Sequence, residues 1–137
     1  MDRPLADRSR ELQTEIDGLS EALGVHPIQV GLRTDDGLNV FVTEDGSYHF
    51  AYYERGRMSF DQAGNRDDVL YWYCEDIVTS RAARAVGDRA ERFQYEYQVL
   101  SRLNPQWAKR RVHELAALFR NGQPEDLSLL PNIGEPV

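Results

Sequence analysis

The chain has 137 residues, which suffices for one domain with a single core but not for two independent domains. Hydrophobic residues make up 41% and charged residues 28%, a composition that excludes a disordered chain. The formal net charge of -7, from 23 acidic and 16 basic side chains, repels nucleic acids and anionic membranes and favours basic partners. Because the sequence has neither a run of about 18 apolar residues nor an apolar signal core, we expect a soluble, cytoplasmic protein.

An amphipathic helix is predicted from Pro4 to Leu23, where apolar residues recur at spacings of three and four, and Gly24 is its expected end. The period then changes to two, which predicts strands at 28–32, 38–42 and 48–55. A fourth strand is expected at 57–61. The breaks between them contain TDDG, EDG and RG, which are turn signals. These segments predict an antiparallel four-stranded meander.

Three helices follow the predicted strands. Helical periodicity spans residues 67–86, 88–103 and 105–121, with Asn65 and Asp68 as a capping box and Asn104 as a later cap. The overall prediction is a single α+β domain, 1–137, with an N-terminal helix, the meander, and three C-terminal helices packed on one sheet face. Its ordered core is expected at about 4–122. Residues 123–137 should form an irregular tail, docked through Leu127, Leu129 and Leu130.

The residues that could carry chemistry do not form a recognisable site. The single cysteine, Cys74, excludes a disulfide framework or zinc cluster and lies in an apolar helical stripe, which predicts an inert core thiol. The histidines His26, His49 and His113 lack metal-ligand spacing, and the glycines form no phosphate-binding loop. We therefore predict no enzyme, metal or cofactor. A hydrolase that uses His49 or His113 as a base remains the enzymatic alternative.

Aromatic residues are concentrated in the stretch YHFAYYERG, residues 48–56. In a strand, Tyr48, Phe50 and Tyr52 would face the core, whereas Tyr53 and Arg55 would face outward. Exposed aromatic residues beside arginine are typical of protein interfaces. The alternative for Tyr53 is ordinary cross-strand packing.

Three segments together resemble immunity protein family sixty-three of the bacterial polymorphic toxin systems. They are YHFAYYERG, LYWYCEDIVTSRAA and DRAERFQYEYQVLSRLNPQWAKRRVHEL. In that pattern a strand ends in Glu-Arg-Gly, a helix opens Leu-Tyr-Trp, and a Pro-x-Trp helix follows. The resemblance covers roughly residues 10–118. It implies an antidote that binds the C-terminal domain of a cognate toxin one to one, with no reaction of its own.

The toxins of such systems are often nucleases with basic clefts, which an acidic protein could occupy. The expected charged contacts are Glu54, Glu75 and Asp76, and the expected anchors are Tyr53, Arg55 and Trp72. Alternatively, Glu54 and Arg55 could form an internal ion-pair network with Arg89 and Arg92. A scaffold or regulatory module for another partner is the alternative function. The oligomeric state is left open.

Overall fold

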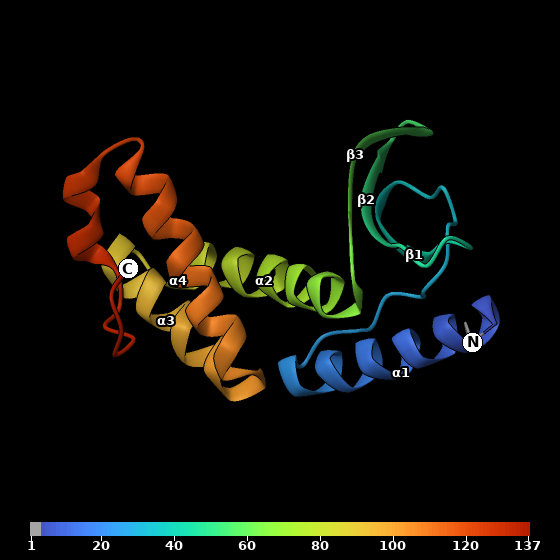
Figure 1. Cartoon of the computed structure of the whole chain (residues 1–137), viewed down its shortest axis with the longest axis horizontal. Helices are drawn as coiled ribbons and strands as arrows, with labels where there is room; N and C mark the ends of the chain where they lie inside the picture. Colours follow the sequence, from blue (N-terminus) through green and yellow to red (C-terminus); the bar gives the residue numbers. More distant parts are fainter. Residues whose placement is uncertain (1–3) are drawn as a thin grey trace. The chain divides into compact units, whose positions relative to one another are not determined.

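The computed structural model describes residues 4–137, which form helices before and after one antiparallel sheet (Figure 1). The elements are α1 (Leu5–Leu23), β1 (Gly37–Val42), β2 (Tyr48–Glu54), β3 (Arg57–Gly64), α2 (Arg66–Ala85), α3 (Arg89–Leu103), α4 (Pro105–Arg120) and the 3₁₀ helix η1 (Pro124–Leu129). The chain divides into two compact units, a first unit that extends to Tyr73 and a second unit that begins at Cys74. The α+β class is confirmed. The single domain and the packing of the helices on one sheet face stay predictions.

The predicted helix ends are confirmed. They were predictable because each one depends on a few neighbouring residues. Gly24 adopts the left-handed conformation with φ 71°, and its N–H donates to the Glu21 carbonyl at the end of α1. At the start of α2, Asn65 and Asp68 exchange hydrogen bonds between backbone N–H and side-chain oxygen, at 3.0 and 2.8 Å. Asn104 caps α4 by accepting from the N–H of Gln106 at 2.9 Å.

The sheet has three strands in the order β1-β2-β3, so β2 is the central strand. On β2, Phe50 pairs with Val40 of β1 and with Gln62 of β3. The register between β2 and β3 shifts between Tyr52 and Tyr53, where Ser59 is the extra residue of β3. The strand predicted at 57–61 is therefore confirmed, and β3 extends beyond it to Gly64.

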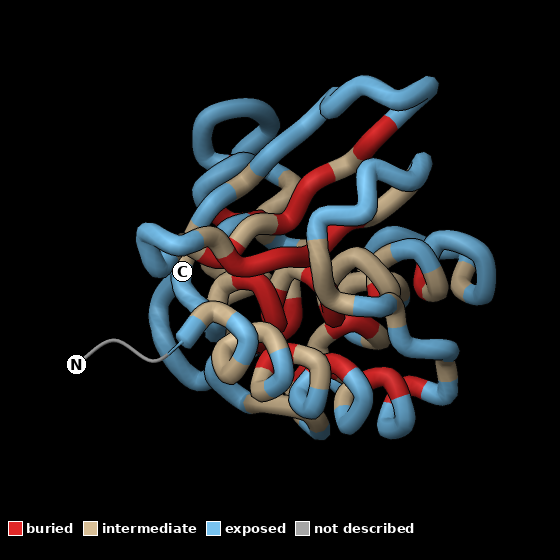
Figure 2. The backbone as a smooth tube through the Cα atoms, turned by 90° about the vertical axis from the view of Figure 1, so that its right-hand side faces the viewer, coloured by how far each residue is buried: buried red, intermediate tan, exposed pale blue. Residues whose placement is uncertain are grey.

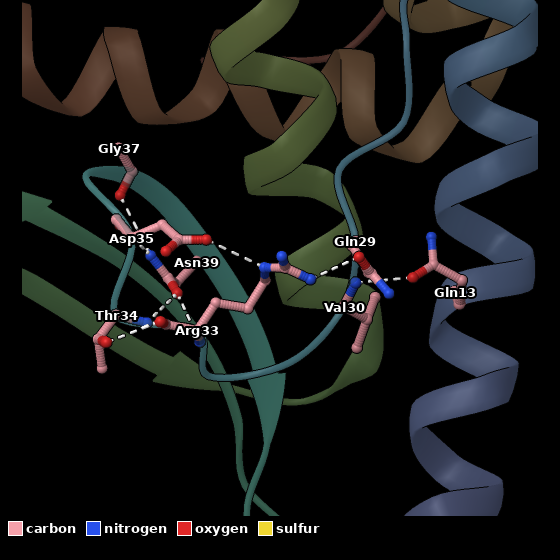
Figure 3. Close-up of polar contacts among 8 residues, drawn as sticks. All are labelled: Gln13, Gln29, Val30, Arg33, Thr34, Asp35, Gly37 and Asn39. Atoms are coloured by element: carbon pink, nitrogen blue, oxygen red, sulfur yellow. Dashed lines mark hydrogen bonds and ion pairs between the residues drawn. The ribbon is translucent and has the colours of Figure 1, made fainter.

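The strand predicted at 28–32 is wrong. Gly31 donates one backbone hydrogen bond to the Val40 carbonyl, at 2.8 Å, but no ladder continues from it. The amide of Gln13 on α1 instead binds the segment. It donates to the Ile28 carbonyl at 2.9 Å, and it accepts from the Val30 N–H at 2.7 Å (Figure 3). A side chain thus forms the hydrogen bonds to backbone groups that a neighbouring strand would otherwise have formed.

Both faces of β2 contribute buried side chains. Tyr48 and Phe50 of one face are 8% and 6% exposed, while Ala51 and Tyr53 of the other are 0% and 8% exposed. Figure 2 shows that most of the turns are exposed, and most of the buried residues belong to strands and helices. Helix α1 is tied to α2 inside the first unit by a buried hydrogen bond between Ser20 and Tyr73, at 2.7 Å.

The second unit contains the rest of α2 with α3, α4 and the C-terminal segment. Residues 123–137 include η1 and are more ordered than the expected irregular tail. Arg89 on α3 pairs with Asp126 of η1 at 3.1 Å, and its guanidinium lies over the rings of Phe93 and Phe119. Ile133 is 7% exposed, whereas the predicted anchors Leu127, Leu129 and Leu130 are only partly buried.

Candidate partner-binding surface

The turn between β2 and β3 has a backbone conformation that residues other than glycine rarely adopt. Arg55 and Gly56 both have positive φ, at 54° and 76°, between the paired residues Glu54 and Arg57. This is the pattern of a type I′ hairpin turn, which matches the twist of the strands. Gly56 adopts it easily, but Arg55 does so at a cost of about 1–2 kcal/mol.

A second strained turn lies beside the first one. Thr34 has φ 57°, and it and Arg55 are the two non-glycine residues with positive φ within residues 4–137. The two turns are joined by a hydrogen bond from the Gly56 N–H to the Asp36 carboxylate, at 3.3 Å. Both strained residues therefore lie at the same end of the sheet.

The buried side chain of Asn39 on β1 fixes the turn around Thr34 (Figure 3). Its Oδ1 accepts from the N–H groups of Arg33 and Thr34, at 2.9 and 3.1 Å, and its Nδ2 donates to the Asp35 carbonyl at 2.9 Å. Asn39 is 3% exposed. One side chain that cannot be solvated thus determines the shape of an exposed turn.

Exposed apolar side chains lie within five residues of these turns in the sequence. Leu32, Met58 and Phe60 are 53%, 43% and 47% exposed, and they are three of the five large hydrophobic residues that are exposed in the described part of the chain. We call residues 32–36 and 54–60 the turn-end surface. All of them are exposed, and the surface contains both apolar and charged side chains.

The net charge of the chain belongs to the first unit. Residues 1–73 contain 14 of the 23 acidic and 7 of the 16 basic side chains, which accounts for the whole formal charge of -7. In the second unit acidic and basic residues balance. A positively charged partner is therefore attracted to the unit that carries the turn-end surface.

The structure brings together two of the six residues expected at the interface. Glu54 and Arg55 are exposed on the turn-end surface. The prediction that Tyr53 faces outward is wrong, because its side chain is buried on a central strand that has buried residues on both faces. Sequence reasoning missed Met58 and Phe60. Their signal was the position of 57–61 as the last strand of a meander, which leaves it at an edge.

The other three expected interface residues lie on α2. Trp72 is partly buried, and its ring packs against that of Phe50 in a T-shaped arrangement with the centroids 6.3 Å apart. Asp76 is partly exposed, in the second unit. Arg89 pairs with Asp126, and Arg92 donates to the Gly87 carbonyl at 2.9 Å. The alternative network with Glu54 and Arg55 stays a prediction.

Glu75 takes part in an ion-pair cluster of the second unit. Arg111 on α4 lies 3.2 Å from the carboxylate of Glu75 and 2.9 Å from that of Glu96 on α3. The side chain of Glu96 is 6% exposed and that of Glu75 is 26% exposed. Burial raises the pKa of Glu75 above its ordinary value of 4.5, although the positive charge of Arg111 opposes the rise. The cluster joins three helices.

We expect Glu75→Gln to be more stable relative to wild type at pH 7 than at pH 4. A carboxyl with a raised folded-state pKa contributes stability below its unfolded pKa of 4.5, and this contribution is lost as the pH rises through the folded value. Glutamine does not ionise, so the variant does not lose this stability as the pH rises. Urea unfolding midpoints between pH 4 and pH 7 measure the difference, and a constant difference across that range would contradict the assignment.

Two of the three histidines lie beside carboxylates. His49 stacks on Phe41 with ring centroids 4.8 Å apart, and its Nδ1 lies 2.9 Å from the Asp61 carboxylate. His113 lies 3.6 Å from the Glu135 carboxylate. Across residues 4–137, no three His, Cys, Asp or Glu side chains are grouped so that they could hold a metal ion. None of the described helices is both long and apolar enough to span a membrane.

We expect Cys74 to be unreactive in the folded protein. The side chain is fully buried, as predicted from its apolar stripe, and burial raises the pKa of the thiol to about 12. Titration with a thiol reagent at pH 8 should modify it slowly in buffer and rapidly in concentrated urea. Equal rates in the two solvents would show that the site opens freely.

Comparison with protein families gives a match over the second half of the sheet and the helices that follow it. The model of the family described as Immunity protein 63 matches residues 44–117, which is more than half of the chain. The matched region begins before β2 and ends within α4, and so includes the turn of Arg55. No curated protein and no solved structure matches the chain significantly.

Proposed function

The chain belongs to the Immunity protein 63 family, and on that basis we propose that it binds a cognate toxin domain and neutralises it by direct contact. The family match is the observation that carries this proposal. We assign the toxin to a polymorphic toxin system and the binding to the cytoplasm. The protein acts as a stoichiometric antidote and catalyses no reaction of its own.

The charge distribution supports binding to a basic toxin. The first unit carries the entire formal charge of -7, and a concentrated negative field raises the rate at which a positively charged partner associates. Fast association benefits an antidote, because it must capture the toxin before the toxin reaches its target. A nuclease with a positively charged cleft is a toxin of this kind.

A growth assay in bacteria tests the proposal. The C-terminal toxin domain encoded immediately upstream of this chain's gene is induced with this chain, with an unrelated immunity protein, or alone. We expect growth to continue only when this chain is present. Arrest of growth despite soluble expression of both proteins would contradict the proposal and favour a scaffold role with another partner.

A further inference from the structure

We propose that the turn-end surface, residues 32–36 and 54–60, is the surface on which the toxin domain docks. This inference rests on the proposed function and adds to it the contact site, which the family match does not specify. Three independent features of the first unit converge on this surface: its fixed strained turns, its exposed apolar residues, and its place on the acidic unit.

The two turns are held rigid before any partner binds. Asn39 makes three hydrogen bonds to the backbone of residues 33–35, and Asp36 joins that turn to Gly56. A surface that is already ordered loses little conformational entropy on binding. Backbone strain at Thr34 and Arg55 persists because these contacts enforce it, and such strain is typical of functional surfaces.

Met58 and Phe60 lie on β3, which is an edge strand of the sheet. The outer edge of β1 is shielded by the segment that contains Gly31, which bonds to Val40. Strand β3 is the other edge, and within residues 4–137 no strand pairs with its outer side. Proteins usually protect such edges. Here the edge instead exposes Met58 and Phe60, which suits burial against another protein.

The turn-end surface itself carries three acidic and three basic side chains, so the attraction for a positively charged partner comes from the acidic unit around it. Apolar contact area is provided by Leu32, Met58 and Phe60. Arg55 adds an arginine, a residue type that is enriched with aromatic residues at the centres of interfaces. The surrounding unit has a net charge of -7, which disfavours a second copy of the same chain by repulsion. A basic toxin domain satisfies both conditions.

Two variants of the full-length chain test the site. Met58→Ser combined with Phe60→Ser removes exposed apolar side chains, and Arg55→Gly removes the arginine while relieving the strained turn. Leu118→Ser is the matched control, because Leu118 is 66% exposed but lies on α4 in the second unit. We expect the first two variants to bind the upstream toxin domain at least about tenfold more weakly, and the control to bind like wild type.

The possible outcomes separate this inference from the proposed function. If wild type itself does not bind the toxin domain, the proposed function fails and the inference fails with it. If wild type binds and the Met58, Phe60 and Arg55 variants bind equally well, the inference alone is overturned. Sedimentation velocity of the free proteins adds one further result. If the serine variant dissociates a wild-type dimer without changing toxin affinity, the surface joins two copies of the chain instead.

Discussion

Replacing Arg111 with alanine is expected to lower the free energy of unfolding by about 3–5 kcal/mol. Arg111 is the shared cation between Glu75 and Glu96, and its side chain is 20% exposed. Without it, two largely buried carboxylates face each other with no compensating charge. Since these residues come from α2, α3 and α4, the loss should destabilise the packing of the whole second unit.

Urea unfolding followed by circular dichroism measures this effect, with Arg110→Ala as the matched control. Arg110 is the neighbouring arginine, and its guanidinium lies 3.4 Å from Glu114 one turn along the same helix. Such exposed pairs contribute well under about 1 kcal/mol. A result in which Arg111→Ala costs no more than Arg110→Ala would show that the buried cluster does not stabilise the fold.

Replacing Asn39 with alanine is expected to cost about 2–3 kcal/mol of stability and to release the turn around Thr34. The substitution removes the bonds to the N–H groups of Arg33 and Thr34 and to the Asp35 carbonyl. Each net hydrogen bond of this kind contributes about 1 kcal/mol. The turn should then relax, because its left-handed conformation at Thr34 is no longer enforced.

Asn39→Asp separates the two halves of this contact. The carboxylate keeps an acceptor for the two N–H groups but cannot donate to the Asp35 carbonyl, so we expect an intermediate loss. Amide hydrogen exchange at Arg33 and Thr34 reports the turn directly. Fast exchange in the alanine variant and slow exchange in wild type are expected, and equal exchange in the two proteins would contradict this role for Asn39.

The sequence predicts the helices well because their limits are local. Gly24, the pair Asn65 and Asp68, and Asn104 each act on backbone groups within a few residues. The failure at residues 28–32 has the opposite origin. Alternation indicates extended backbone but does not say what will satisfy its hydrogen bonds. Here the amide of Gln13, far away on α1, satisfies them.

The candidate site was only partly predictable from the sequence, for a related reason. The Arg55 turn is visible as Glu-Arg-Gly, but its bond to Asp36 joins residues 20 positions apart. The burial of Tyr53 depends on what covers the second face of β2, which alternation cannot indicate. The ion pair of Glu75 was also not predictable, because its partner Arg111 belongs to another helix.

Titration calorimetry of this chain with the toxin domain encoded beside its gene tests the central claim most directly. At low salt we expect one-to-one binding, and we expect the affinity to fall as the salt concentration rises, since the charge of -7 is concentrated in one unit. Absence of binding at both low and high salt concentration would contradict the proposed function. Tight binding whose affinity does not change with salt concentration would contradict electrostatic attraction between this chain and the toxin.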